Sequence, residues 1–131
     1  MTIVVDANVA IAVLDPAHVF HRAAIRRCIE EGDIAILNVT HAEALIHPTR
    51  LGRFDDAADE LARLRFVIHP IGNEVANRAR LLRAEYGNRN FPMVDAIVVG
   101  LGAEHNWPVV TCDAKWPRMQ GVTIEVLTSD R

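Results

Sequence analysis

The sequence has few of the residues that staple or anchor a small secreted protein. Its 131 residues include only two cysteines, Cys28 and Cys112, which are too few for a disulfide framework. We expect both thiols to be small buried groups in a reducing environment, which predicts a cytoplasmic protein. No run of about 18 uncharged apolar residues occurs, so we expect no transmembrane segment. The first residues also lack the basic start of a signal peptide.

Motifs for several kinds of chemistry are missing as well. There is no G-x-x-x-x-G-K-[ST] segment, which disfavours nucleoside triphosphate binding by a P-loop. The only serine is Ser129, in the tail, and no serine–histidine nucleophile pattern stands out. His41 and Glu43 match the first half of a zinc deaminase signature, but its P-C-x-x-C half is absent.

The length and the apolar content indicate a single domain over residues 1–131. Half of the residues are hydrophobic, and a chain of this length buries roughly two-thirds of its unfolded surface. Apolar β-branched runs alternate with amphipathic segments, which predicts an α/β fold. We expect a three-layer α/β/α sandwich around a mostly parallel five-stranded sheet. The predicted strands are 3–5, 34–37, 66–69, 109–111 and 122–127, and the predicted helices are 8–14, 17–31, 40–48, 55–65, 72–85 and 93–105.

Four acidic residues are expected at one edge of this sheet. Asp6 and Asp113 follow the first and fourth predicted strands, and Glu43 and Asp95 lie in the first turns of two predicted helices. Ligands gather at the carboxyl ends of parallel strands. Neighbouring carboxylates raise one another's pKa values unless cations lie among them, and oxygen ligands suit Mg²⁺ or Mn²⁺. Such ions activate water and stabilise charge on a phosphodiester, so the pattern predicts phosphodiester hydrolysis.

Each acid also has a structural explanation of its own. Thr40 is a good N-cap, and Glu43 three residues later completes a capping-box pattern. The helix dipole favours Asp95 in a first turn, and Asp6 and Asp113 are able to cap the helices that follow them. Taken singly, each structural explanation is the better one. Taken together, the convergence of four separated segments favours the metal site.

Four blocks of sequence resemble PIN domains, and their order and spacing are most similar to those of VapC toxins from bacterial toxin–antitoxin pairs. The blocks are 4-VVDANVAIAVL-14, 40-THAEALIH-47, 92-PMVDAIVVGLGAEH-105 and 109-VVTCD-113. Four blocks in this order are far more specific than an isolated T-x-D or D-x-N. The resemblance extends over nearly the whole chain.

The resemblance implies an Mg²⁺- or Mn²⁺-dependent endoribonuclease, a toxin that cleaves RNA and inhibits translation and growth. Asn8 matches a polar residue that supports the first aspartate, and Thr111 matches the hydroxyl of the T-x-D block. The implied partners are an antitoxin protein, whose C-terminal tail wraps the toxin and blocks its site, and a second copy in a homodimer. The family's acidic metal site corresponds to Asp6, Glu43, Asp95 and Asp113.

The sequence departs from the family's pattern in two places. Many relatives carry another acid shortly after the last aspartate, where this chain has Lys115 and Trp116, which leaves two-ion occupancy open. We expect Lys115 to pair with a metal-bound phosphate or with Asp113, and Trp116 to pack in the core rather than stack on a base. Gly100 and Gly102 stand where relatives often have alanines. They indicate close helix packing, for instance at a dimer contact.

All 14 basic residues except Lys115 are arginines. Phosphate contacts and a G+C-rich genome explain this bias equally well. The net charge of −3 does not exclude RNA, because four acids that bind cations would leave the remaining charges nearly balanced. A solvated helix face is as good an explanation as RNA binding for the candidate contacts, which are Arg50, Arg53, Arg83 and Lys115.

Two other classes of protein fit part of this pattern. A receiver-like phosphoacceptor signalling domain also gathers aspartates and Mg²⁺ at strand ends. That class needs a lone aspartate after the third strand, where this chain has His69 and Pro70. A non-catalytic PIN relative that binds RNA or a protein is the other alternative, and the complete set of four acids argues against it.

Overall fold

A parallel sheet of five strands forms the centre of the molecule. The computed structural model describes residues 1–129. All the strand pairings are parallel, and the order across the sheet is β3-β2-β1-β4-β5. The strands are β1 (Thr2–Val5), β2 (Asp33–Leu37), β3 (Phe66–His69), β4 (Val109–Thr111) and β5 (Ile124–Val126).

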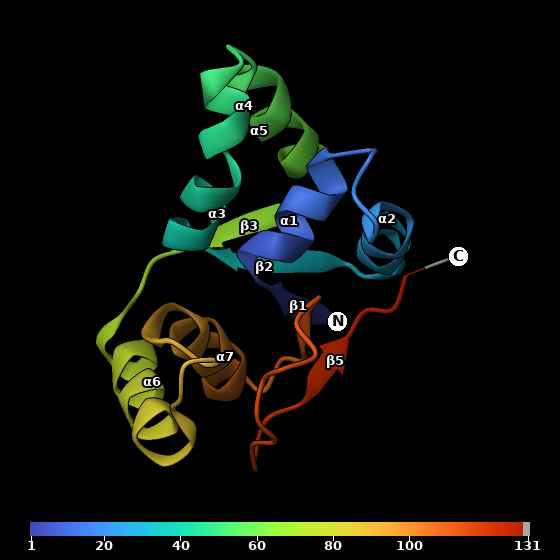
Figure 1. The fold of residues 1–131 in the computed structure, drawn as a ribbon. Coiled ribbons are helices and arrows are strands. Elements are labelled where there is room, and N and C mark those ends of the chain that lie inside the picture. The colour runs from blue at the N-terminus through green and yellow to red at the C-terminus, as the bar shows by residue number, and fades with distance from the viewer. Residues whose placement is uncertain (130–131) are drawn as a thin grey trace.

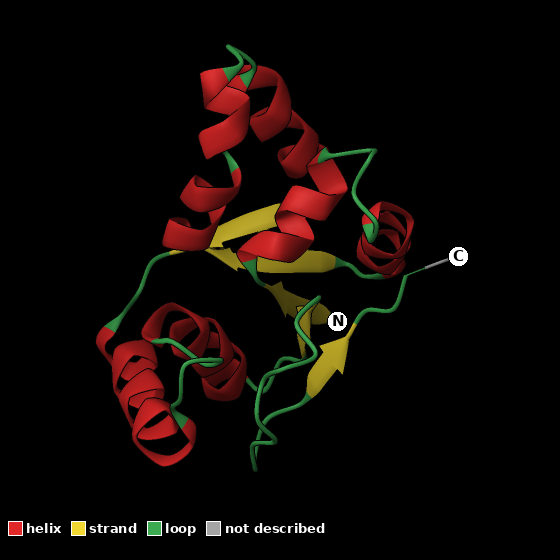
Figure 2. Cartoon of the chain, in the orientation of Figure 1, coloured by secondary structure: helices red, strands yellow, loops and turns green. Residues whose placement is uncertain are grey.

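Helices cover both faces of this sheet, so the predicted α/β/α sandwich is confirmed. One layer holds α1 to α5 and the other holds α6 and α7 (Figure 1). Figure 2 shows the strands enclosed between the two sets of helices. In residues 1–129, no helix has the length and apolarity needed to span a membrane. The helices are α1 (Ala7–Leu14), α2 (His21–Glu30), α3 (Asn38–Ala44), α4 (Ile46–Arg50), α5 (Phe54–Arg63), α6 (Asn73–Tyr86) and α7 (Met93–His105).

Two apolar cores, one on each face, follow from the pleat of the central strand. Ile3 and Val5 belong to the core under α1, α2 and α5, while Val4 between them belongs to the core under α6 and α7. All three side chains are fully buried, because a sheet covered on both faces needs apolar residues at successive positions. Trp116 lies in the second core, as predicted.

The direction in which successive strands are added to the sheet changes beside β1. The chain runs from β1 outward to β2 and β3, passes through α6 and α7, and then adds β4 and β5 on the other side of β1. The carboxyl ends of the strands at such a reversal form a crevice where ligands bind. Asp6 and Asp113 follow the two strands concerned, β1 and β4. The order also differs from the 2-1-3-4-5 order of receiver-type domains, so the receiver-like alternative is wrong.

The region around Glu43 differs from the prediction. Because α3 begins directly after β2, at Asn38, Thr40 lies inside the helix and its hydroxyl donates to the carbonyl of Leu37 at 3.0 Å. The predicted capping box is therefore wrong, and Glu43 lies in the second turn rather than the first. Pro48 does not end the helix either. It occupies the first turn of α4, where its missing N–H is no loss.

The two glycines of α7 allow close packing within the chain. A Cβ atom at Gly100 would lie 3.0 Å from the carbonyl oxygen of Val75 and 3.3 Å from the backbone nitrogen of Ala79, both in α6. A Cβ atom at Gly102 would lie 2.4 Å from a methyl group of Val109 in β4. The predicted close packing is confirmed. It joins elements of one chain, so the suggestion of a dimer contact at these glycines is wrong.

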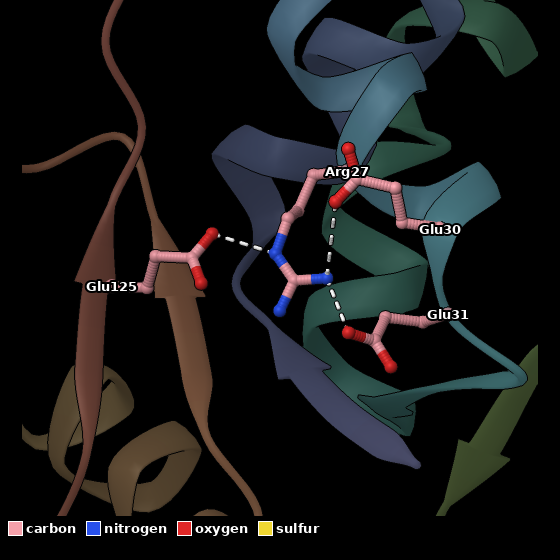
Figure 3. A network of polar contacts seen from close by, with 4 residues as sticks. All are labelled: Arg27, Glu30, Glu31 and Glu125. Atoms are coloured by element: carbon pink, nitrogen blue, oxygen red, sulfur yellow. Dashed lines mark hydrogen bonds and ion pairs between the residues drawn. The ribbon is translucent and has the colours of Figure 1, made fainter.

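An ion-pair network attaches the edge strand β5 to α2. Arg27 Nε donates to Glu125 Oε2 at 2.7 Å, and Arg27 Nη1 pairs with Glu31 and, at 4.0 Å, with Glu30. Figure 3 shows the guanidinium between Glu125 of β5 and the carboxylates of Glu30 and Glu31 at the end of α2. The hydrogen bond to Glu125 is the main reason that the pKa of Arg27 lies above its usual value. The Arg27 guanidinium is therefore held in its charged form by the carboxylates around it.

Candidate active site

Asp6 is buried at the end of β1, with 5% of its surface exposed. Its Oδ1 accepts the backbone N–H of Val9 at 3.1 Å, which makes Asp6 the N-cap of α1. Its Oδ2 accepts the hydroxyl of Thr111 at 2.6 Å. Asp6 therefore caps a helix and at the same time bonds to the end of β4.

Thr111 connects the carboxyl ends of β1 and β4. Its side chain is fully buried, and its hydroxyl donates to Asp6 while accepting the backbone N–H of Asp113 at 3.0 Å. The Asp113 Oδ1 atom in turn accepts the backbone N–H of Lys115 at 2.8 Å. These bonds fix the backbone that carries Asp113 relative to the Asp6 carboxylate.

Asp95 approaches the same edge from the other layer. It lies in the first turn of α7, as predicted, and is partly buried. Its Oδ2 accepts the indole N–H of Trp116 at 3.1 Å. The Trp116 ring packs edge-on against Phe91, with ring centroids 5.8 Å apart. Asp95 is thus held to the loop that follows β4.

Electrostatic interactions link Asp95 to each of the other three acids. Burial is the main cause that raises the pKa of Asp6 from 3.8 to about 6, and the charges of Asp95 and Asp113 raise it further against the opposing hydrogen bonds. Burial also raises the pKa of Asp95, with added contributions from Asp113 and Glu43. Asp95 therefore interacts with all three of the other acids, whereas Glu43 lies at the exposed side of the cluster. Burial and mutual repulsion make the ionised forms of Asp6 and Asp95 unfavourable in the folded chain, and a bound cation would reduce this free-energy cost.

The donor set fits a hard divalent cation. In residues 1–129, no three His, Cys, Asp or Glu side chains are arranged to hold a metal ion as they stand. Within the same residues, the Glu43 carboxylate, Asp95 Oδ1 and Asp113 Oδ2 accept no hydrogen bond from the chain. Carboxylate oxygens without donors, beside a buried fourth carboxylate, are the ligands that Mg²⁺ and Mn²⁺ prefer.

A thiol, Cys112, lies directly before Asp113 in the chain. Cys112 is partly buried between Thr111 and Asp113, and both cysteines are free thiols, as predicted. Burial raises the pKa of Cys112 to about 12, and the charge of Asp6 adds to the effect. Burial and the charge of Asp6 both disfavour the thiolate of Cys112, which is the form that attacks electrophiles.

The residues predicted to support the acids or to contact RNA are spread more widely. Asn8 is exposed in the first turn of α1, and the donor to Asp6 from that turn is the neighbouring backbone N–H. Arg53 and Glu43 line a cavity of about 510 Å³ between α1, α3, α4 and α5. Arg83 lies in the opposite layer, with its guanidinium over Gly87. Lys115 and Arg50 are exposed, in the loop after β4 and in α4 respectively.

Sequence analysis missed the contact between Trp116 and Asp95. A signal for it was present, because a buried indole N–H needs an acceptor, and few acceptors exist in an apolar core. The sequence did not show which acceptor lies within reach. Phe91, fully buried directly before Pro92, was also missed, because its partner Trp116 comes from a distant segment.

The fold agrees with the family that the sequence matches. The PIN domain family profile matches residues 3–122, so the chain belongs to the PIN domain family. A comparison with curated protein sequences finds no significant match.

Solved structures of toxin–antitoxin proteins share this fold. A toxin–antitoxin complex from Klebsiella pneumoniae is 22% identical with a TM-score of 0.76, covering 92% of this chain and 95% of that one. VapBC2 from Rickettsia felis, bound to a promoter DNA fragment, is 15% identical with a TM-score of 0.74, covering 98% and 100%. VapC20 from Mycobacterium tuberculosis, a Sarcin-Ricin loop cleaving toxin, is 15% identical with a TM-score of 0.68, covering 86% and 91%. The resemblance to VapC proteins is confirmed at the level of the fold.

Proposed function

We propose that this protein is an Mg²⁺- or Mn²⁺-dependent endoribonuclease and the toxin of a toxin–antitoxin pair. The observation that carries the proposal is the mutual electrostatic coupling of the acids at one edge of a PIN fold, where Asp95 interacts with Asp6, Asp113 and Glu43. Four separated segments contribute to this cluster. Helix capping explains Asp6, but it does not explain why Asp95 interacts electrostatically with the other three acids.

Three of the acids are proposed to bind the metal ion, and the fourth is held by the protein itself. Asp95, Asp113 and Glu43 each retain an oxygen that accepts no hydrogen bond within residues 1–129, and these oxygens would hold the ion. A bound divalent ion supplies an activated water and stabilises charge on the phosphodiester. Asp6, held by Val9 and Thr111, would add negative charge to the cluster. The exposed side at Glu43 admits the RNA strand.

The comparisons support a partner protein. Structures with this fold include a toxin–antitoxin complex from Klebsiella pneumoniae and VapBC2 from Rickettsia felis. We infer that an antitoxin binds this chain and blocks the acidic edge, and that two copies form a homodimer. Free thiols and an RNA substrate agree with action in the cytoplasm.

The test is cleavage of RNA by the purified protein with Mg²⁺ or Mn²⁺. Wild type should cleave a structured RNA with single-stranded loops, and excess EDTA should stop cleavage. Asp95→Asn should keep the fold and lower the rate by about 100-fold or more, because it removes charge from a metal ligand. Expression of wild type, but not of Asp95→Asn, should arrest growth.

Asp59→Asn is the matched control, since Asp59 is an exposed acid of α5 outside the cluster. It should cleave and arrest growth like wild type. Equal cleavage by Asp95→Asn, or cleavage by wild type in EDTA, contradicts the proposal. Mn²⁺ binding without cleavage of any RNA would favour the non-catalytic relative instead.

A further inference from the structure

The loop after β4 occupies one oxygen on each of two acids in the cluster. The backbone N–H of Lys115 donates to Asp113 Oδ1 at 2.8 Å, and the indole N–H of Trp116 donates to Asp95 Oδ2 at 3.1 Å. Two consecutive residues thus hold carboxylates that come from different elements. Each carboxylate keeps its second oxygen without a donor from residues 1–129.

We propose that Trp116 is a positioning residue that holds Asp95 for the metal ion, and that its indole responds directly when the ion binds. The proposal rests on the proposed function, because it assumes that Asp95 is a ligand. The indole N–H only donates, and it occupies Oδ2 of Asp95. Oδ1 accepts no hydrogen bond within residues 1–129, so it is the oxygen offered to the ion.

The packing of Trp116 makes it suited to this role. The side chain is 9% exposed, and its ring contacts fully buried Phe91, four residues before Asp95. Trp116 therefore contacts one residue just before α7 and one residue in its first turn. Because Trp116 is three residues after Asp113, the same loop carries one acid and bonds to the other. Groups that orient metal ligands in this way often change metal affinity or activity by 10- to 100-fold.

A tryptophan that only fills the core would have a different signature. Losing it would lower the melting temperature, but the ligands would bind the ion as before once the protein is folded. Metal affinity and the response of the indole therefore separate the two roles. Both measurements are independent of catalysis.

The chain provides a matched control in its second tryptophan. Trp107 lies beyond the C-terminus of α7, stacked on His105, whereas Asp95 lies in the first turn of that helix. A helix of 13 residues is about 20 Å long, so Trp107 is remote from the acids. Trp107→Phe leaves Trp116 as the single reporter, and Trp116→Phe leaves Trp107.

The experiment titrates Mn²⁺, a paramagnetic quencher, into wild type and both variants. The Trp107→Phe protein should bind Mn²⁺ with wild-type affinity, and its fluorescence should be quenched. The Trp116→Phe protein keeps an aromatic ring against Phe91 but lacks the N–H. Its Kd for Mn²⁺, measured by calorimetry, should rise about tenfold, and its remaining fluorescence should not respond.

Two further experiments test the inference if Trp116→Phe does not fold or if the contact itself is in question. If Trp116→Phe does not fold, benzothienylalanine replaces tryptophan in the Trp107→Phe protein, which keeps the ring size and removes the N–H. Without metal, Asp95→Ala in the Trp107→Phe protein should shift the emission of Trp116, which tests the contact itself. Wild-type Mn²⁺ affinity without the N–H, or equal quenching of both indoles, overturns the inference. If wild type binds no Mn²⁺ and cleaves no RNA, the proposed function fails and the inference fails with it.

Discussion

Thr111 donates its hydroxyl proton to Asp6 across 105 positions of sequence, in a 2.6 Å hydrogen bond with no solvent access at Thr111. The bond ties the end of β4 to the end of β1, at the point where the strand order reverses. The same oxygen accepts the backbone N–H of Asp113. One hydroxyl thus sets the relative position of two acids that the proposed chemistry requires.

Thr111→Val should lower the free energy of unfolding by about 1–3 kcal/mol at pH 7.5, measured by urea denaturation. The isosteric valine removes a donor from a buried carboxylate and leaves the N–H of Asp113 without its acceptor, and unsatisfied buried groups cost this much. RNA cleavage should fall in parallel, because the Asp113 backbone is no longer fixed.

Thr111→Ser is the control for this prediction, since serine keeps the hydroxyl and loses only a methyl group. It should retain most of the cleavage activity of wild type. If the valine and serine variants unfold at the same urea concentration, the hydroxyl does not have the role assigned to it.

The metal-free protein should lose stability as the pH rises through the titration of Asp6. The folded pKa of about 6 exceeds the ordinary value of 3.8, so the folded state binds the proton more tightly than the unfolded state. The contribution is fully present below about pH 4 and is lost as the pH rises to 6 and above. It amounts to about 3 kcal/mol.

Asp6→Asn isolates this effect from the titration of the other acids. In EDTA, the difference in unfolding free energy between pH 4 and pH 7 should change by about 3 kcal/mol relative to wild type. Mg²⁺ should stabilise wild type at pH 7 and stabilise Asp6→Asn less, because the variant lacks one negative charge of the cluster. Parallel pH curves for the two proteins in EDTA would refute the assignment.

The sequence predicted those features that depend on a strong local pattern. The strands at 66–69 and 109–111 and the helix at 93–105 have the predicted bounds, because apolar runs and Pro92 mark them unambiguously. The edge that carries Asp6 and Asp113 was predictable too, since parallel strands share their carboxyl ends.

The remaining features depend on contacts between distant segments. The sequence of α3 allowed a capping box at Thr40, but packing continued the helix directly from β2, and tertiary contacts override such local preferences. The bond from Trp116 to Asp95 depends on how the loop after β4 approaches α7. No local pattern contains that information, so the sequence predicted the members of the cluster but not how the chain holds them.

Gly100→Ala should destabilise the protein by about 1–3 kcal/mol, measured by thermal or urea unfolding, although alanine favours helices by about 1 kcal/mol. The new methyl group would meet backbone atoms of Val75 and Ala79 at 3.0 and 3.3 Å, and backbone atoms of a packed helix move little. Gly32→Ala is the control, because its Cβ would meet nothing closer than 3.6 Å. A neutral or stabilising Gly100→Ala would show that α6 and α7 separate easily.

Arg27→Ala should detach β5 from α2 and cost about 1–2 kcal/mol of unfolding free energy. The side chains of Arg27 and Glu31 are only 16% and 13% exposed, so their pairing is screened less than that of surface ions. Glu125 then loses the donor that holds the edge strand. Amide hydrogen exchange over residues 124–126 should quicken more than exchange in β1.

Arg78→Ala provides the comparison, since Arg78 pairs with Glu104 at 3.4 Å and is 47% exposed. Its loss should change stability by less than about 0.5 kcal/mol and leave exchange in β5 unchanged. High salt should reduce the small loss of unfolding free energy caused by Arg78→Ala. Most of the loss caused by Arg27→Ala should persist, because the mostly buried Arg27 pair is screened less by salt. If both variants respond equally to salt, the Arg27 network is an ordinary surface contact and β5 is held by its pairing with β4 alone.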